Sequence, residues 1–75
     1  MVETKTINSP MTGRVIEVMV SDGDEISTGD MLLVLESMKM ENEIYSEYSG
    51  TIAKVHVKEL QDVTEDDPLI DVQIS

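Results

Sequence analysis

One lysine of this chain lies between two methionines, in the segment Ser37-Met38-Lys39-Met40. Strand-like runs precede and follow it, so the four residues are predicted to form a hairpin tip, where Asn, Asp or Gly is the usual choice. An exposed lysine amine becomes a nucleophile once it loses its proton. A merely solvated turn lysine is the simple alternative, but it leaves two exposed thioether side chains unexplained. Because methionine is flexible and polarizable, it suits a surface that several partners contact in turn.

The other residues that could do chemistry form no catalytic pattern. His56, the only histidine, lies between Val55 and Val57, which are predicted to face inward, so its side chain is predicted to face outward. The acidic stretches Asp22-Gly23-Asp24-Glu25 and Glu65-Asp66-Asp67 lack the ligand spacing of an EF-hand loop and are predicted to be turns with solvated charge. We therefore expect neither a catalytic triad nor a metal site.

Length, composition and charge limit the class of protein. The chain has 75 residues, enough for a single small domain, which we expect to span residues 1–75. A net charge of −11 disfavours nucleic acids and anionic membranes as partners. The longest apolar run covers only residues 31–35, so neither a membrane-spanning helix nor a signal peptide is expected. The absence of cysteine fits a reducing, cytoplasmic compartment.

The chain contains an internal repeat at an offset of 37 residues. At this offset the segment TGRVIEVMV, residues 12–20, aligns with SGTIAKVHV, residues 49–57. Other positions align at the same offset: Ile7 with Ile44, Ser9 with Ser46, Ile26 with Val63, Leu32 with Leu69, Leu33 with Ile70 and Leu35 with Val72. Agreement at one offset over most of the chain indicates two copies of one structural unit.

Each copy is predicted to hold about four short strands and no helix. Apolar residues alternate with polar or mixed neighbours in both copies: Ile16, Val18 and Val20, then Ala53, Val55 and Val57. In the apolar run, Leu33 and Leu35 are predicted to face inward because Val34 aligns with Asp71. About eight strands predict an all-β fold, a small flattened barrel or sandwich of two pseudo-twofold-related halves.

The glycines mark where the two copies agree and where they differ. Gly13 and Gly50 align, and each is predicted to allow either a close approach or a positive φ at a strand start. Leu60, however, stands where the first copy has Gly23. A turn that needs a positive φ would be strained at this leucine.

The repeat also predicts where the lysine lies relative to the chain ends. Subtracting 37 from position 39 gives residue 2, and adding 37 gives a position just past residue 75. Because a pseudo-twofold axis exchanges the two copies, the lysine tip and the termini are expected at opposite ends of the molecule.

The predicted hairpin tip and several other segments of the chain resemble a known family. The segment Glu36-Ser37-Met38-Lys39-Met40-Glu41-Asn42 resembles the (E)-A/S-M-K-M signature of biotinyl domains, the biotin carboxyl carrier modules of biotin-dependent carboxylases. The resemblance covers nearly the whole chain, including residues 9–13, 22–26, 29–30 and 49–51. It departs at Leu60, where the family commonly has glycine.

The resemblance implies that a biotin protein ligase joins biotin to Lys39 through an amide bond. The attached biotin would carry CO₂ between the biotin carboxylase and carboxyltransferase sites of a biotin-dependent carboxylase or decarboxylase. Met38, Met40 and Glu36 would help partner enzymes recognise the tip. The protein would then be a non-catalytic carrier, either an excised domain or a free-standing subunit, with its acyl substrate set by the carboxyltransferase.

Two other functions stay open at the level of sequence. Lipoyl carriers share the fold but usually carry D-K-A at the modified lysine, so Met38 and Met40 argue against this class. An unmodified small β domain used for binding or scaffolding is the other alternative. An enzyme is disfavoured because the chain shows no nucleophile–base pair.

Overall fold

The structure, a computed structural model, describes residues 3–74, which form eight β-strands and no helix. The strands are β1 (Glu3–Asn8), β2 (Gly13–Val18), β3 (Glu25–Ile26), β4 (Met31–Ser37), β5 (Met40–Tyr45), β6 (Gly50–Val55), β7 (Asp62–Val63) and β8 (Pro68–Ile74). The described residues therefore contain no helix long and apolar enough to cross a membrane. The prediction of an all-β fold with about eight strands is confirmed.

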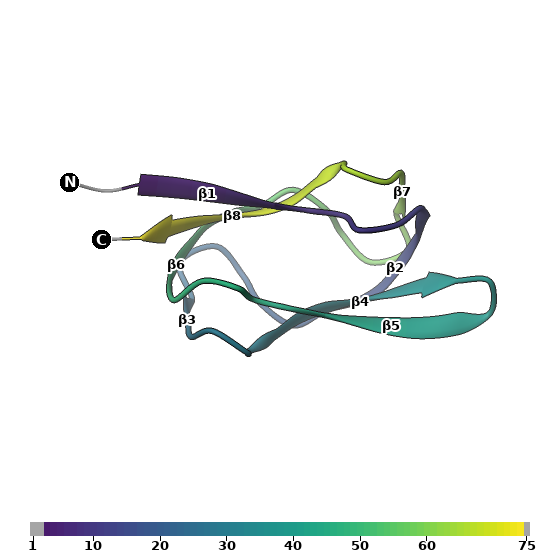
Figure 1. The fold of residues 1–75 in the computed structure, drawn as a ribbon, viewed down its shortest axis with the longest axis horizontal. Helices are drawn as coiled ribbons and strands as arrows, with labels where there is room; N and C mark the ends of the chain where they lie inside the picture. The colour runs from purple at the N-terminus through teal and green to yellow at the C-terminus, as the bar shows by residue number, and fades with distance from the viewer. Residues whose placement is uncertain (1–2, 75) are drawn as a thin grey trace.

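The strands form two four-stranded antiparallel sheets, in the orders β1-β8-β6-β3 and β5-β4-β2-β7. Figure 1 shows β1 and β8 along one side of the molecule and β4 and β5 along the other. Each sheet holds two strands from each copy of the repeat. Neither copy can therefore form a sheet of this kind by itself, and the two halves fold as one interleaved unit.

The structural repeat has the same offset as the sequence repeat. Adding 37 to the bounds of β1, β2, β3 and β4 gives the bounds of β5, β6, β7 and β8. Exchanging these pairs converts one sheet order into the other. The two halves are thus related by a pseudo-twofold operation, as predicted.

A β-bulge in each half changes which residues face the core. The register slips at Ile16, where β2 pairs with β4, and at the equivalent Ala53, where β6 pairs with β8. A bulge adds one residue to one strand and shifts the alternation of side chains. Val15 and Ile52 are consequently buried at 0% and 1% exposure, whereas Ala53 is exposed. The prediction of a simple alternation through Ile16 and Ala53 is wrong for this reason.

Leucine, isoleucine and valine from both sheets fill the space between them. Leu33 and Leu35 are fully buried in this core, as predicted. Val34 is also only 7% exposed, but it is not part of the core cluster. The members of the core cluster are Ile7, Val15, Ile26, Leu32, Leu33, Leu35, Ile52, Val57, Val63, Leu69, Ile70 and Val72.

Gly13 and Gly50 permit two backbones to approach closely. A Cβ atom on Gly13 would lie 2.5 Å from the carbonyl oxygen of Glu36, and one on Gly50 would collide with the carbonyl oxygen of Gln73. Neither glycine has a positive φ. Of the two roles predicted for them, close approach is confirmed and positive φ is wrong.

The turns of each half are anchored on the other half. The N–H of Gly23 donates to the carbonyl of Ile52 (2.8 Å), and the N–H of Leu60 donates to the carbonyl of Val15 (2.6 Å). The φ angles of Gly23 and Leu60 are 90° and 72°. The strain predicted at Leu60 is therefore present, and the same hydrogen bond holds the backbone in this conformation in both halves.

The β4–β5 turn and the described chain ends lie at opposite ends of the molecule (Figure 1), whose longest dimension is 40 Å. Glu3 and Ile74 are paired at the end remote from this turn. The predicted separation is confirmed for these residues. Val2 and Ser75, on which the prediction was also based, lie outside the described residues.

Candidate functional site

The predicted tip is a two-residue hairpin turn. Ser37 pairs with Met40 as the last pair between β4 and β5, so only Met38 and Lys39 form the loop. Their φ angles are 55° and 65°. Two consecutive positive φ angles are typical of a type I′ turn, which matches the right-handed twist of the flanking strands.

The residue types make this turn strained. Type I′ turns favour Asn-Gly because most side chains disfavour the left-handed region. Each non-glycine residue held there costs about 1 to 2 kcal/mol. A domain of this size has a total stability of only about 5 kcal/mol or less. Strain of this kind is found at functional sites, where the surrounding structure maintains it.

The side chains of the tip extend into solvent. Met38 is 92% exposed and Met40 is 68% exposed, and Lys39 is exposed between them. Within residues 3–74, no hydrogen bond or ion pair joins the Lys39 amine to another side chain. An acyl group attached to this amine would therefore break no hydrogen bond or ion pair between side chains of these residues. The tip therefore fits a covalently attached prosthetic group.

Glu36 lies near the end of β4 and is exposed. Its cross-strand partners are Glu41 on β5 and Arg14 on β2. The Arg14 guanidinium donates to Asp62 at 3.0 Å, and this hydrogen bond and charge, followed by the charge of Glu36, raise the pKa of Arg14. Because like charges face each other at Glu36 and Glu41, the approach to the lysine is acidic.

The outer faces of the two sheets differ in charge although their backbones are equivalent. Cross-strand partners share a face, so the exposed residues of the outer face of the sheet that holds the tip include Glu17, Glu36, Glu41, Glu43 and Asp62 and one cation, Arg14. The equivalent residues of the other sheet, in the same order, are Lys54, Gln73, Thr4, Thr6, Glu25 and Thr51, so that sheet carries only one acidic residue at these positions. The pseudo-twofold symmetry of the fold is thus broken by charge.

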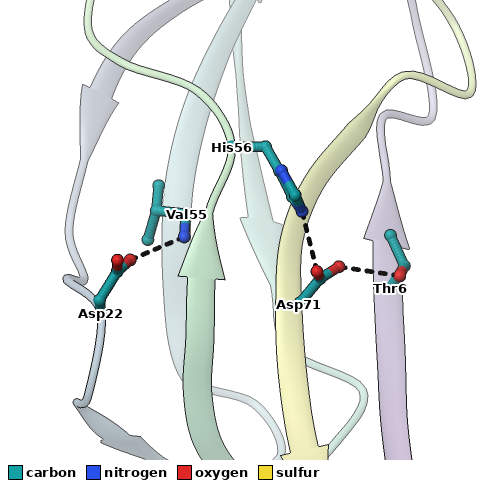
Figure 2. Close-up of polar contacts among 5 residues, drawn as sticks. All are labelled: Thr6, Asp22, Val55, His56 and Asp71. Carbon is teal, nitrogen blue, oxygen red and sulfur yellow. Dashed lines mark hydrogen bonds and ion pairs between the residues drawn. The ribbon is translucent and has the colours of Figure 1, made fainter.

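His56 directly follows β6 of that other sheet and is not part of the hairpin tip. Its Nε2 atom lies 2.9 Å from Oδ2 of Asp71, and the Thr6 hydroxyl donates to Oδ1 of the same carboxylate at 2.8 Å (Figure 2). The hydrogen bond from His56, followed by the one from Thr6, lowers the pKa of Asp71. His56 lies outside the core, as predicted. The contact between His56 and Asp71 was not predicted from the sequence. The alignment of Asp71 with Val34, which was predicted to face outward, could have indicated that Asp71 also lies on an outer face.

The acidic stretches are used by the turns. Asp24, Asp30 and Asp67 each accept a hydrogen bond at 2.8 Å from the backbone N–H three residues earlier. Asp22 accepts one at 2.8 Å from the N–H of Val55 (Figure 2). These bonds satisfy loop donors that the strands do not reach. Among the described residues, no group of three or more His, Cys, Asp or Glu side chains could hold a metal ion.

A shallow groove of about 400 Å³ lies between the two halves, away from the tip. Its lining consists of four pairs of residues related by the offset of 37: Val18 with Val55, Val20 with Val57, Ser21 with Lys58 and Asp22 with Glu59. The groove therefore lies on the pseudo-twofold axis. It contains no residue of the hairpin turn, so it does not form a pocket around the lysine.

Comparison with known proteins identifies the family. The chain belongs to the biotin/lipoyl family, whose model is described as "Biotin-requiring enzyme" and matches residues 5–72. The chain is 42% identical over 67 residues to the biotin carboxyl carrier protein of Streptococcus mutans, across 89% of this chain and 52% of that protein. It is 40% identical over 67 residues to mitochondrial pyruvate carboxylase of Mus musculus, across 89% of this chain and 6% of that protein.

Solved structures with the same fold are also parts of larger enzymes. A single-chain, multi-domain long-chain acyl-CoA carboxylase matches with a TM-score of 0.89 and 28% identity, over 96% of this chain and 7% of that one. Kluyveromyces lactis urea carboxylase matches with a TM-score of 0.86 and 26% identity, over 93% of this chain and 6% of that one. The chain thus spans about half the length of the Streptococcus mutans relative and a small part of the others. The family and these relatives imply covalently attached biotin as the cofactor.

Proposed function

We propose that this chain is a biotin carboxyl carrier whose Lys39 accepts biotin from a biotin protein ligase. The carrier would serve the biotin carboxylase and carboxyltransferase sites of a biotin-dependent carboxylase or decarboxylase. The observation that carries this proposal is the two-residue turn at Met38-Lys39, which holds an amine without a polar partner among residues 3–74, at the end of the molecule remote from the described termini. Family membership supports the choice of biotin.

The tip residues have separate roles in this proposal. After losing its proton to the ligase, the Lys39 amine attacks the carbonyl carbon of biotinyl-adenylate, so that the amide bond forms as the bond to AMP breaks and AMP leaves. The short turn fixes the position of the amine, and its exposure lets it enter an enzyme pocket. Met38 and Met40 provide apolar contact area on both sides of the amine, and Glu36 provides a negative charge three residues before it.

The rest of the domain contributes position and reach. Biotin, when attached, supplies the ureido nitrogen that carries CO₂. The chain contributes no catalytic group in this proposal, and the partner enzymes supply the reactive groups. A tethered carrier presents its arm at a local concentration on the order of millimolar when its linker spans both sites. A cytoplasmic location stays a prediction of the sequence.

Intact mass after incubation with ligase, ATP, Mg²⁺ and biotin tests the proposal. We expect one biotinyl increment on the full chain and none on Lys39→Arg, which keeps the charge but replaces the amine. Lys54→Arg, a matched change on the equivalent sheet, should still take up one biotin.

Two results would contradict this function. One is a folded chain whose mass does not change with an active biotin ligase, which favours an unmodified binding domain. The other is a lipoyl increment, with no biotinyl increment, in cells that contain both ligases, which selects a lipoyl carrier.

A further inference from the structure

The two methionines beside Lys39 are the most exposed thioethers of residues 3–74. Met38 is 92% exposed and Met40 is 68% exposed, compared with 45% for Met19. Met11 and Met31 are only partly exposed, and Met11 packs against the core. Oxidation of methionine requires that an oxidant reach the sulfur atom, so accessibility ranks these residues as targets.

We propose that Met38 is a second modification site of the tip, where oxidation to the sulfoxide slows the enzymes that act on Lys39. This inference rests on the proposed function, because it concerns how the same lysine is recognised. The oxidants are peroxides. The O–O bond of the peroxide breaks, one oxygen forms an S–O bond with the thioether, and hydrogen peroxide leaves as water, so sulfur loses two electrons and the peroxide gains them.

The position of Met38 in the turn makes its oxidation matter more for the recognition of Lys39 than oxidation of another exposed methionine. It is one of the two loop residues, with φ fixed at 55° beside the amine-bearing residue. Because β4 and β5 pair on both sides of the loop, the backbone cannot move Met38 away without breaking the last strand pair. An enzyme that binds the turn around Lys39 therefore meets an exposed Met38 as the neighbouring loop residue.

Oxidation changes the chemistry of that contact. The sulfoxide is polar and chiral and carries an additional oxygen atom, whereas the thioether is apolar. Burying a polar group without a hydrogen-bond partner in an interface is unfavourable. Since the Met38 side chain extends into solvent, its oxidation removes no core contact. Recognition should therefore fall while the stability of the fold is kept, and methionine sulfoxide reductases should reverse the change.

The test uses the full chain with limiting hydrogen peroxide, which is then removed before the ligase is added. Among the methionines of residues 3–74, peptide mass mapping should place the first oxygen on Met38 and the second on Met40. The second-order rate of biotinylation should fall roughly tenfold, as expected for an unpaired polar group in an interface. The midpoint of thermal unfolding should stay constant, and treatment with reductases of both sulfoxide epimers should restore the rate.

Each variant is compared with itself before and after peroxide, so differences in its starting rate do not matter. Met38→Leu should lose most of the peroxide effect because leucine keeps an apolar side chain of similar size without the sulfur, and the remainder comes from Met40. Met40→Leu and Met19→Leu should keep most of the effect.

Three results would overturn the inference. Oxidised chain could be biotinylated at the untreated rate, Met19 could be oxidised before Met38, or the unfolding midpoint could fall together with the rate. Failure of the untreated chain to accept biotin is a different result, because it overturns the proposed function itself and removes the basis of this inference.

Discussion

At the scale of single residues, the unusual feature of the tip is the left-handed backbone of Met38 and Lys39. Asparagine and glycine would relieve the strain there, but neither provides an amine or an apolar contact beside it. The tip therefore combines the turn geometry that places the amine with the side chains that present it. Stability and function make opposite demands on these two positions.

Asp71 gives a residue-scale prediction about pH. His56 and Thr6 lower its pKa in the folded state, so the carboxylate stabilises the fold above the unfolded-state pKa of about 3.9. This contribution is lost as the pH falls through the lower, folded-state pKa. Between about pH 5 and pH 2, the free energy of unfolding should therefore fall less in Asp71→Asn than in the unmodified chain. The difference should be less than about 1 kcal/mol because the pair is partly solvated.

Urea unfolding at several pH values measures this effect. Glu65→Gln is the control, since no hydrogen bond or ion pair joins the Glu65 side chain to another residue within the described part of the chain. If Asp71→Asn and Glu65→Gln follow the same pH profile as the unmodified chain, the proposed linkage is absent.

At the scale of elements, the same arrangement of a turn hydrogen-bonded to a bulged strand occurs in both halves. Each turn donates from a positive-φ residue to the carbonyl next to the bulge of the other half. A positive φ accompanies this hydrogen bond in both halves. The first half adopts this φ with Gly23 and the second adopts it with Leu60, at a cost in backbone strain.

Exchanging the residue types at these turns gives a reciprocal prediction. Leu60→Gly should raise the free energy of unfolding by up to about 1 kcal/mol, because relief of a strain of about 1 to 2 kcal/mol exceeds the added entropy of the unfolded chain. Gly23→Leu should lower it by about 1 kcal/mol. A Cβ atom at Gly23 would have no atom within 4 Å. The loss of unfolding free energy in Gly23→Leu therefore measures backbone strain without a steric clash of the Cβ atom.

The midpoint of thermal unfolding provides the measurement, since about 1 kcal/mol shifts it by roughly 4 to 8 °C in a domain of this size. Equal or inverted shifts for the two variants would show that the turns do not carry the proposed strain.

At the scale of the whole molecule, shape and charge act together. The tip and the described chain ends occupy opposite ends of a particle that is 40 Å long, so attachment at the termini leaves the lysine free to reach a partner. The net charge is −11, and the tip-bearing sheet is the more acidic on its outer face. Such a field accelerates encounter with a cationic surface and slows encounter with an anionic one.

This charge asymmetry predicts a face-dependent rate. The double variant Glu41→Gln, Glu43→Gln should lower kcat/KM for biotinylation by roughly threefold at low salt. The effect should diminish at about 0.5 M salt, where screening of exposed charges dominates. Thr4→Lys with Gln73→Lys makes the same change in net charge on the equivalent sheet and should have less effect. Equal effects of the two double variants would attribute the rate to net charge alone.

Much of this protein was predictable because the repeat is present in the residues themselves. Eight strands in two equivalent halves follow from apolar positions that recur at one offset, and the placement of Lys39 opposite the chain ends follows from its position relative to that offset. The position of the hairpin tip also followed from local sequence, since Met38, Lys39 and Met40 are consecutive residues between two strands.

The tertiary structure alone decided the features that depend on pairing between distant segments. The bulges at Ile16 and Ala53 result from strand register, and a local alternation pattern cannot reveal an added residue before the partner strand is known. The Asp71 carboxylate meets His56 and Thr6 because β1, β6 and β8 lie together in one sheet. Composition and periodicity determine which faces are apolar, but the long-range hydrogen bonds between strands determine which polar side chains meet on the outside.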